Sequence, residues 1–336
     1  MRVFVTGGTG SIGRQIVRRL IEGGDRAVVL SRRQGEAWAM PELRGAEVVQ
    51  GDPGTSDDWA RHLEGCDAVI NLVGHNIFGQ RWGPAVKKKI RDSRVYGTQH
   101  VVSAIRKAGT RPGVLVQASA IGYYGFHADE ELTEEAGPGA DFMARICREW
   151  EEAAHPAEDL GVRVPVIRTG VVLAPGEGAL GTMTPIFRWV PGGAAPVGGR
   201  SPLLPATGQQ WLSWIHIDDI VGIFLLALNS TDARGPINGT APNPMRNADF
   251  SRALAKAVHR PFVPLGPPDV MLRVLLGEVA QVVTKGQRVL PARAQAIGYG
   301  FRFPDVQGAL RDLFARKAPA PAPPAPKPAA AAGAHH

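Results

Sequence analysis

Short apolar runs alternate with helix-length segments through the first 120 residues of the chain. The apolar runs read RVFVTG, AVVLSR, AEVVQGD, DAVINLVG and GVLVQAS, and one helical segment spans about Ile12 to Glu22 while a longer one ends near Lys107. Strands that alternate with helices in this way build repeated βαβ units, which place a parallel sheet between two helical layers. The pattern predicts an α/β fold with a doubly wound parallel sheet of the Rossmann-like kind.

The pattern changes in the second half of the chain. A helix is expected near residues 141–155, a strand in VRVPVIRTGVVL, and an N-cap at the end of WLSWIHIDD for the helix that begins IVGIF. The Gly- and Pro-rich residues 191–210 predict a loop over a cleft. We therefore expect a nucleotide-binding domain over residues 1–235, with strand and loop insertions at 165–215, a smaller and mostly helical substrate lobe over 236–316, and an extended Ala/Pro tail over 317–336.

Composition narrows the class of protein. The chain has 336 residues, 44% of them hydrophobic, and its longest apolar run near residue 220 is IVGIFLLAL, too short to cross a bilayer. It opens on a strand that enters a glycine turn, and Cys66 and Cys147 form no CxxC pair, so we expect a globular, cytoplasmic protein without structural zinc. The net charge of +7 raises the question of nucleic acid, but no nucleic-acid motif accompanies it, and Lys87 to Lys89 are expected on a solvated helix face.

The strongest chemical signal is the glycine pattern in VTGGTGSIGRQIV. Gly7, Gly10 and Gly13 follow the first strand and open a helix, and Thr9, Ser11 and Ile12 lie between them. Glycines at this spacing let the backbone turn tightly and approach a pyrophosphate, toward which the helix N–H groups point. The pattern predicts a dinucleotide site, and the alternative is a glycine-rich structural turn.

The end of the second strand indicates which dinucleotide binds. An NAD enzyme often has an acidic residue there, whereas this chain has Ser31, Arg32 and Arg33, and an arginine suits the 2′-phosphate of NADP. The alternative is two surface arginines. Asp52 either contacts the adenine or caps the next turn. Asn71 to Gly74 end the fourth strand where the chain would pass beneath the cofactor.

Ten motifs in a fixed order make a family resemblance specific. They are TGGTGSIG, NLVGHNI, RW, SRVYGT, SAIGYYG, WEEAA, RTGVVLAPGEGALG, WIHIDD, GPINGTAPNPMRNADF and KGQRVLPAR. Over about residues 1–315 the chain resembles the epimerase family proteins of the atypical short-chain dehydrogenase/reductases, which carry a small C-terminal domain of their own and some of which are labelled cell-division-inhibitor-like.

The resemblance implies bound NADP, with NAD disfavoured, and a set of contacts to it. Besides the glycine turn, these are Ser31, Arg32, Leu72, Val73, Lys89, Arg94 and Val172. It changes the interpretation of Lys89 and Arg94, because one turn of a helix over the cofactor can direct both toward it. The chain departs from the family pattern at His75, where Glu is common, and in a longer loop between Arg200 and Gln209.

The same resemblance implies an incomplete proton relay. Active short-chain dehydrogenases use a Ser, a Tyr and a Lys four residues after the Tyr, and Ser119 occupies the first place. The Tyr and Lys places align with Met143 and Cys147, and the Asn that completes the relay aligns with Arg94.

Three interpretations remain open for the adjacent Tyr123 and Tyr124. One of them replaces the missing acid, with Arg94 or Lys89 lowering its pKa; or both pack around the cofactor or cleft without chemistry; or Cys147 acts through its thiol. The first interpretation makes Ser119, Tyr123 and Tyr124 the candidate catalytic residues.

The remaining polar motifs have structural explanations. His216, Asp218 and Asp219 of WIHIDD can be drawn as a metal site, but two Asp before a helix usually cap it, so no metal is expected. His216 remains a candidate for substrate contact. Glu151 and Glu152 are expected on a solvated helix face.

These observations predict an NADP(H)-binding oxidoreductase or epimerase-like protein that transfers hydride on a small carbonyl or carbinol substrate with a degenerate Tyr/Lys site. The rival hypothesis is a non-catalytic NADPH sensor. We expect a small-molecule substrate and neither nucleic acid nor membrane as partner, and the superfamily's habit would be a homodimer through two long helices.

Overall fold

The computed structural model describes residues 1–78, 80–189, 196–197 and 206–316. In that part of the chain no helix is both long and apolar enough to cross a membrane. The predicted loop at 191–210 lies mostly outside the described residues, as does the predicted tail at 317–336.

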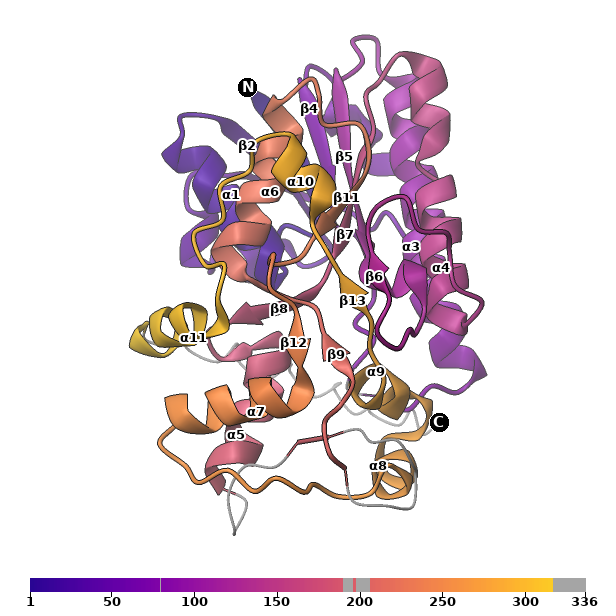
Figure 1. The fold of residues 1–336 in the computed structure, drawn as a ribbon. Coiled ribbons are helices and arrows are strands. Elements are labelled where there is room, and N and C mark those ends of the chain that lie inside the picture. The colour runs from indigo at the N-terminus through magenta and orange to yellow at the C-terminus, as the bar shows by residue number, and fades with distance from the viewer. Residues whose placement is uncertain (79, 190–195, 198–205, 317–336) are drawn as a thin grey trace, which may run out of the picture.

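A seven-stranded parallel sheet forms the centre of the molecule (Figure 1). Its strands, in spatial order, are β11 (Gly235–Gly239), β7 (Pro165–Thr169), β5 (Val114–Ala120), β4 (Ala68–Asn71), β1 (Arg2–Thr6), β2 (Arg26–Ser31) and β3 (Glu47–Gln50). The chain order reverses between β1 and β4, and in such sheets ligands bind at the carboxyl ends of the strands beside that reversal. The predicted fold class is confirmed.

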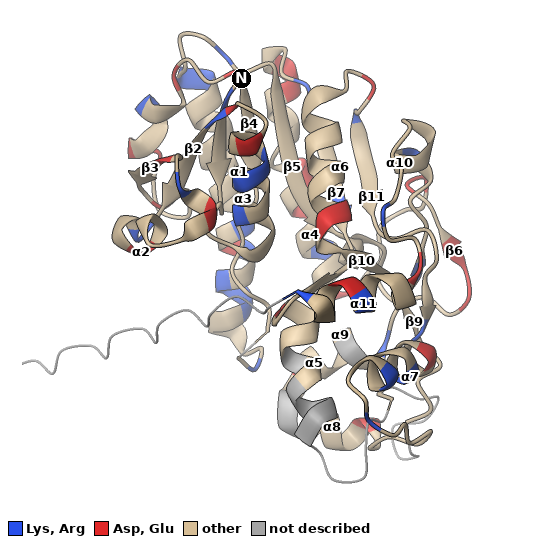
Figure 2. Cartoon of the chain, turned by 90° about the vertical axis from the view of Figure 1, so that its left-hand side faces the viewer, with Lys and Arg blue, Asp and Glu red and all other residues tan. Residues whose placement is uncertain are grey.

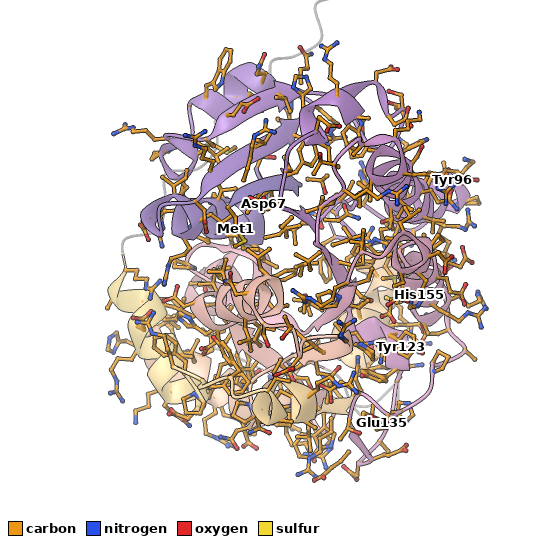
Figure 3. The ribbon with its side chains drawn as sticks, turned by 90° about the horizontal axis from the view of Figure 1, so that it is seen from above. Met1, Asp67, Tyr96, Tyr123, Glu135 and His155 are labelled. Atoms are coloured by element: carbon orange, nitrogen blue, oxygen red, sulfur yellow. The ribbon has the colours of Figure 1, made fainter. Side chains whose placement is uncertain are left out.

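Two helical layers cover the sheet. On one face lie α1 (Ser11–Glu22) and α6 (Ile217–Asn229), and on the other lie α3 (Pro84–Lys107) and α4 (Phe142–Glu152). The strands are almost wholly buried because both of their faces are covered, which explains their continuous apolar runs. Figure 3 shows the sheet from above, with Met1 and Asp67 marking the residues that precede β1 and β4.

Short elements complete this half of the chain. They are α2 (Gln34–Trp38), η1 (Pro41–Leu43), η2 (Asp58–Leu63), η3 (Ile121–Tyr124), β6 (Glu131–Leu132) and η4 (His155–Leu160). The stretch expected as one strand divides into β7 and β8 (Val171–Ala174), separated by Gly170. A Cβ on Gly170 would lie 2.7 Å from the Ser213 carbonyl oxygen, so only glycine fits where β8 leaves the main sheet.

Most of the C-terminal residues pack below the carboxyl ends of the strands, whereas residues 292–296 lie beside β11 (Figure 1). They form α5 (Gly178–Trp189), β9 (Trp211–Leu212), β10 (Trp214–His216), β12 (Met245–Arg246), α7 (Asn247–Ala257), α8 (Asp269–Leu276), η5 (Gly277–Val279), α9 (Ala280–Thr284), β13 (Arg288–Val289), α10 (Ala292–Ala296) and α11 (Val306–Ala315). Strand β11 begins at the boundary we predicted but belongs to the main sheet, since Gly235–Gly239 pair with β7. Strand β13 likewise pairs with β6, so the C-terminal segment returns to the nucleotide-binding domain.

Candidate functional site

The glycine turn after β1 leaves no room for side chains. Gly7 has a φ of +65°, and a Cβ there would lie 2.7 Å from the Leu72 carbonyl oxygen. A Cβ on Gly13 would overlap the carbonyl oxygen of Gly7. Gly10 is the N-cap of α1 and has no side-chain cap, so the first N–H groups of the helix stay available to an anion. A dinucleotide phosphate fits this turn. The turn itself lies directly against Leu72, at the end of β4.

Basic side chains gather near the ends of β2 and β4. Arg32 follows β2 and is exposed, and Lys89 is exposed on α3, whose basic positions are blue in Figure 2. Burial lowers the pKa of His75, and the positive charges of Arg94, Lys89 and Arg32 lower it further. Three residues, one after β2 and two on α3, therefore place positive charge around His75, beside the reversal of strand order.

The other predicted cofactor residues border the same edge of the sheet. Leu72 and Val73 are half-buried and follow β4, while Gly74 lies against the Arg94 guanidinium, 3.2 Å from where its Cβ would be. Ser31 ends β2, and its hydroxyl bonds with the backbone of Arg33. Thr9, Ser11 and Ile12 are half-buried around the N-terminus of α1, and Val172 is half-buried on β8.

Asp52 caps its own turn. Its carboxylate accepts a hydrogen bond from the Gly54 N–H at 2.9 Å, and its carbonyl oxygen accepts one from the Thr55 N–H. This contact matches the second of the two roles that the sequence left open.

Ser119 donates its proton to a buried carboxylate. Its Oγ lies 2.6 Å from Oε1 of Glu151, and both residues are less than a tenth exposed. The prediction that Glu151 faces solvent is wrong, whereas Glu152 is exposed as expected. Glu151 points inward because Arg168 of β7 binds it twice, through Nε and Nη2, each at 2.9 Å.

Tyr124 extends this buried network. Its hydroxyl donates to Asn238 Oδ1 at 2.7 Å and accepts from Arg168 Nη1 at 3.0 Å, and its side chain is fully buried. Burial raises the pKa of Tyr124 to about 12, although Arg168 and Asn238 act in the opposite direction. Tyr124 therefore matches the packing interpretation.

Tyr123, labelled in Figure 3, differs from its neighbour. It is half-buried, and its ring centroid lies 3.5 Å from the Arg168 guanidinium carbon. Of the two tyrosines, Tyr123 keeps a hydroxyl that the network does not use.

Met143 and Cys147 of α4 lie beside the turn that carries the two tyrosines. Both face Gly122 of η3, at 3.5 and 3.6 Å from the position of a Cβ on that glycine. Burial raises the pKa of the Cys147 thiol to about 12, so a thiolate is scarce at neutral pH. This removes the basis for the thiol interpretation.

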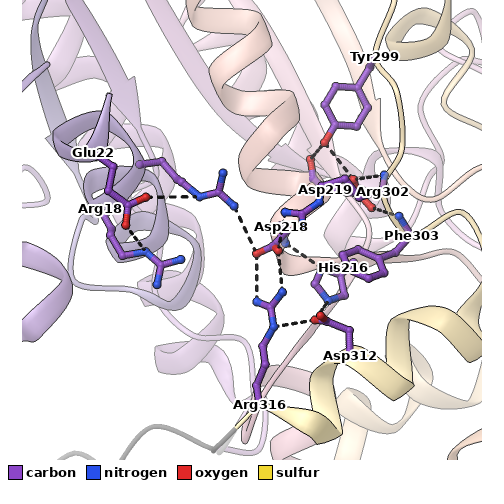
Figure 4. Close-up of polar contacts among 11 residues, drawn as sticks. Arg18, Glu22, His216, Asp218, Asp219, Tyr299, Arg302, Phe303, Asp312 and Arg316 are labelled. Atoms are coloured by element: carbon purple, nitrogen blue, oxygen red, sulfur yellow. Dashed lines mark hydrogen bonds and ion pairs between the residues drawn. The ribbon is translucent and has the colours of Figure 1, made fainter. Parts of the chain in front are cut away.

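The WIHIDD motif anchors the C-terminal segment (Figure 4). His216 is fully buried, accepts the Asp218 N–H at Nδ1 as the N-cap of α6, and contacts Asp312 through Nε2 at 3.1 Å. Asp218 pairs with Arg302 and Arg316. The prediction that His216 contacts substrate is therefore wrong, because its ring is buried and bonded on both nitrogens. The N-cap of α6 is His216 and not one of the two aspartates. In the part of the chain that the structure describes, no group of metal ligands is found.

Asp219 accepts hydrogen bonds from the same segment. Its carboxylate takes the N–H groups of Arg302 and Phe303 and the hydroxyl of Tyr299. Both aspartates thus hold residues 299–316 against α6.

Sequence reasoning missed Arg168, Asn238 and Glu134. Arg168 interrupts the apolar strand PVIRT, and a charged residue inside such a strand needs a buried partner, which was the available signal. Glu134 accepts from the Asn238 and Arg293 N–H groups, and Gln287 donates to the Ile121 carbonyl oxygen. The C-terminal segment thereby fixes the turn that carries the two tyrosines.

The fold and the glycine turn define a Rossmann-type dinucleotide-binding protein. The model of the NAD-dependent epimerase/dehydratase family matches residues 3–238, and a domain of unknown function, DUF1731, matches residues 267–313. The chain belongs to the NAD-dependent epimerase/dehydratase family, among the epimerase family proteins of the atypical short-chain dehydrogenase/reductases.

Relatives resemble the chain over nearly its full length. The chloroplastic epimerase family protein SDR39U1 homolog of Arabidopsis thaliana is 41% identical, covering 93% of this chain and 86% of its own. The epimerase family protein SDR39U1 of Bos taurus is 36% identical, and the match covers 94% of this chain and 100% of that protein. The crystal structure of human SDR39U1 with NADPH has a TM-score of 0.80 and 32% identity, covering 94% of this chain and 100% of that one.

Proposed function

We propose that this protein binds NADPH at the carboxyl edge of the sheet. The observation that carries the proposal is the convergence of Arg32, Lys89 and Arg94 on the point beside the glycine turn, where none of the three has a carboxylate ion-pair partner among the described residues. A 2′-phosphate and a pyrophosphate supply the missing negative charge. The human relative crystallised with NADPH supports the choice of cofactor.

The reaction we propose is hydride transfer on a small carbonyl or carbinol substrate. NADPH supplies the hydride when it is bound. Tyr123 is the proton donor that we propose for this chain, because Tyr124 and Ser119 give their protons to Asn238 and Glu151. Reversible epimerisation is less well supported, since the family resemblance aligns Met143 and Cys147 with the acid and its activating cation, and neither side chain can serve in those roles.

The network around Ser119 favours a second candidate, an NADPH sensor without turnover. Each relay group that the sequence suggested is absent or engaged in buried hydrogen bonds, except Tyr123. The substrate, a homodimer and a cytoplasmic location remain predictions, as do the domain limits.

The two candidates are separated by NADPH oxidation. The protein is mixed with NADPH and a panel of aldehydes, ketones, quinones and nucleotide sugars, and absorbance of the reduced nicotinamide is followed. The enzyme hypothesis expects turnover that Tyr123→Phe abolishes while the variant still binds NADPH. Tight binding with no oxidation across the panel contradicts it and supports the sensor.

A further inference from the structure

An apolar surface begins where the family resemblance aligns the missing acid. Met143 holds that position, and its Cβ lies 3.5 Å from the place of a Cβ on Gly122, so it borders the turn that carries Tyr123. In the active enzymes that the chain resembles, the acid at this position exchanges its proton with the substrate oxygen. The reacting part of a substrate is therefore expected beside a thioether in this chain, where those enzymes have a hydroxyl.

Met143 belongs to a set of half-buried apolar side chains that we call the Met143 surface. They pack against a small buried core that includes Trp82, and they are Ile77, Val86, Phe142, Met143 and Val282. The rings of Phe142 and Trp82 have centroids 5.4 Å apart. The members come from the segment after β4, from α3, from α4 and from α9, so the C-terminal residues contribute to this surface. Half-buried apolar side chains of this kind offer area on which an aliphatic or aromatic group can be removed from water.

The buried polar side chains around the same turn are bonded to one another. The Ser119 hydroxyl donates to Glu151 at 2.6 Å, and the Tyr124 hydroxyl donates to Asn238 at 2.7 Å. A sugar ring needs hydrogen-bond partners for the hydroxyl groups beside its reacting carbon. To serve a sugar, these side chains would have to give up internal hydrogen bonds, and each such loss inside a protein is costly. The contacts around the turn therefore favour an apolar substrate over a sugar.

We propose that the substrate is an apolar carbonyl compound, an aromatic or long-chain aldehyde or ketone, whose apolar part lies on the Met143 surface, and that it is not a nucleotide sugar. This assignment rests on the proposed function, because it takes Tyr123 as the proton donor and NADPH as the source of hydride. The carbonyl carbon gains the hydride as NADPH becomes NADP⁺, the oxygen takes the proton of Tyr123, and solvent returns a proton to Tyr123. The product is the corresponding alcohol.

Binding of a ketone series to the protein loaded with NADP⁺ tests this assignment without turnover, because the oxidised cofactor has no hydride to give. Affinities for 2-butanone, 2-hexanone, 2-octanone and UDP-glucose are measured by calorimetry. Each methylene that leaves water for the Met143 surface is expected to tighten binding by about two- to four-fold. We therefore expect 2-octanone to bind at least about ten-fold more tightly than 2-butanone, and UDP-glucose to bind more weakly than 2-octanone.

A methionine variant provides a second readout. Met143→Gln keeps the length of the side chain but replaces the thioether with an amide, and it is expected to weaken 2-octanone by about five-fold and to leave NADP⁺ within about two-fold. Met271→Gln on α8 is the matched control, because this methionine is 52% exposed and lies outside the Met143 surface. It is expected to leave both affinities unchanged.

The possible outcomes separate this assignment from the proposed function. The assignment is overturned if affinity does not rise along the ketone series, if UDP-glucose binds more tightly than 2-octanone, or if the two methionine variants weaken 2-octanone equally. The series in the wild-type protein decides even if Met143→Gln does not fold. A protein that binds NADP⁺ but none of the four ligands contradicts the assignment and leaves the cofactor site intact, whereas a protein that binds neither NADP⁺ nor NADPH contradicts the proposed function itself.

Discussion

Ser119 and Glu151 share a buried hydrogen bond of 2.6 Å, and Glu151 is held in turn by both nitrogens of the Arg168 fork. Ser119 is the residue that motif reasoning made the centre of a proton relay. In the structure, the Ser119 hydroxyl donates to the Glu151 carboxylate, which connects α4 to β7 through Arg168. We therefore expect this network to contribute first of all to the stability of the fold.

Glu151→Ala is expected to destabilise the protein by about 3–5 kcal/mol, because it leaves the Arg168 charge buried without its partner. Urea denaturation measures the loss. Glu152→Ala on the same helix is the control: its side chain is 60% exposed and its ion pair among the described residues is with Arg148, so a change within about 0.5 kcal/mol is expected. Equal effects of the two substitutions would contradict the buried network.

Tyr124→Phe and Tyr123→Phe are expected to differ in stability. The first removes the acceptor of Arg168 and the donor to Asn238 and should cost about 1–3 kcal/mol. The second keeps the ring over Arg168 and should cost less than about 0.5 kcal/mol. Thermal unfolding of both variants checks this, and a larger loss for Tyr123→Phe would reverse the assigned roles.

His216 makes stability fall in mild acid. Burial is the main cause of its lowered pKa, and the charge of Arg316 adds to it, while Asp218, Asp312 and Asp219 oppose it. Because the folded protein binds the proton more weakly than the unfolded chain, this contribution is complete above the unfolded value of about 6.5 and is lost as pH falls below it.

His216→Asn keeps a side-chain acceptor for the Asp218 N–H but does not titrate. Denaturation midpoints between pH 7 and pH 5 are expected to fall less in this variant than in the wild type. Parallel pH profiles would show that His216 does not carry the effect.

Both thiols are expected to resist alkylation in the native protein at pH 8. Burial raises the pKa of Cys66 to about 11 and that of Cys147 to about 12. Iodoacetamide labelling followed by mass spectrometry, with urea-unfolded protein as the positive control, measures this resistance. Rapid native labelling at Cys147 would restore the thiol interpretation of the site.

The sequence predicted those parts of the molecule that depend on local pattern. The alternation of apolar runs predicted the parallel sheet. The spacing of Gly7, Gly10 and Gly13 predicted a tight turn, and the structure shows why Gly7 is needed there: the Leu72 carbonyl oxygen leaves no room for a Cβ. The sequence pattern failed where partners come from distant elements. The helix pattern predicted an exposed Glu151. The side chain points inward because it binds Arg168, which is 17 residues later and which the local pattern does not reveal.

The C-terminal segment shows the same limit. The role of WIHIDD depends on residues such as Arg316, which is 98 positions beyond Asp218, and no spacing rule connects them. The pairing of β13 with β6 likewise joins residues far apart in the sequence, and no local pattern predicted it.

The glycine turn offers a test of the cofactor site that does not involve charge. Gly13→Ala is expected to abolish NADPH binding, because the new Cβ would overlap the Gly7 carbonyl oxygen and displace the turn. Gly300→Ala is the control, since nothing lies within 4 Å of a Cβ there, and it should bind normally. Normal binding by a folded Gly13→Ala variant would mean that the phosphates do not rest on this turn.

The central claim is that this chain binds NADPH in preference to NADH through the exposed cation at the end of β2. Calorimetric titration of the wild-type protein and of Arg32→Ala with both nucleotides tests it most directly. We predict at least about ten-fold tighter binding of NADPH by the wild type and loss of that preference in the variant. Equal affinities for the two nucleotides, or a preference that survives Arg32→Ala, would contradict the account.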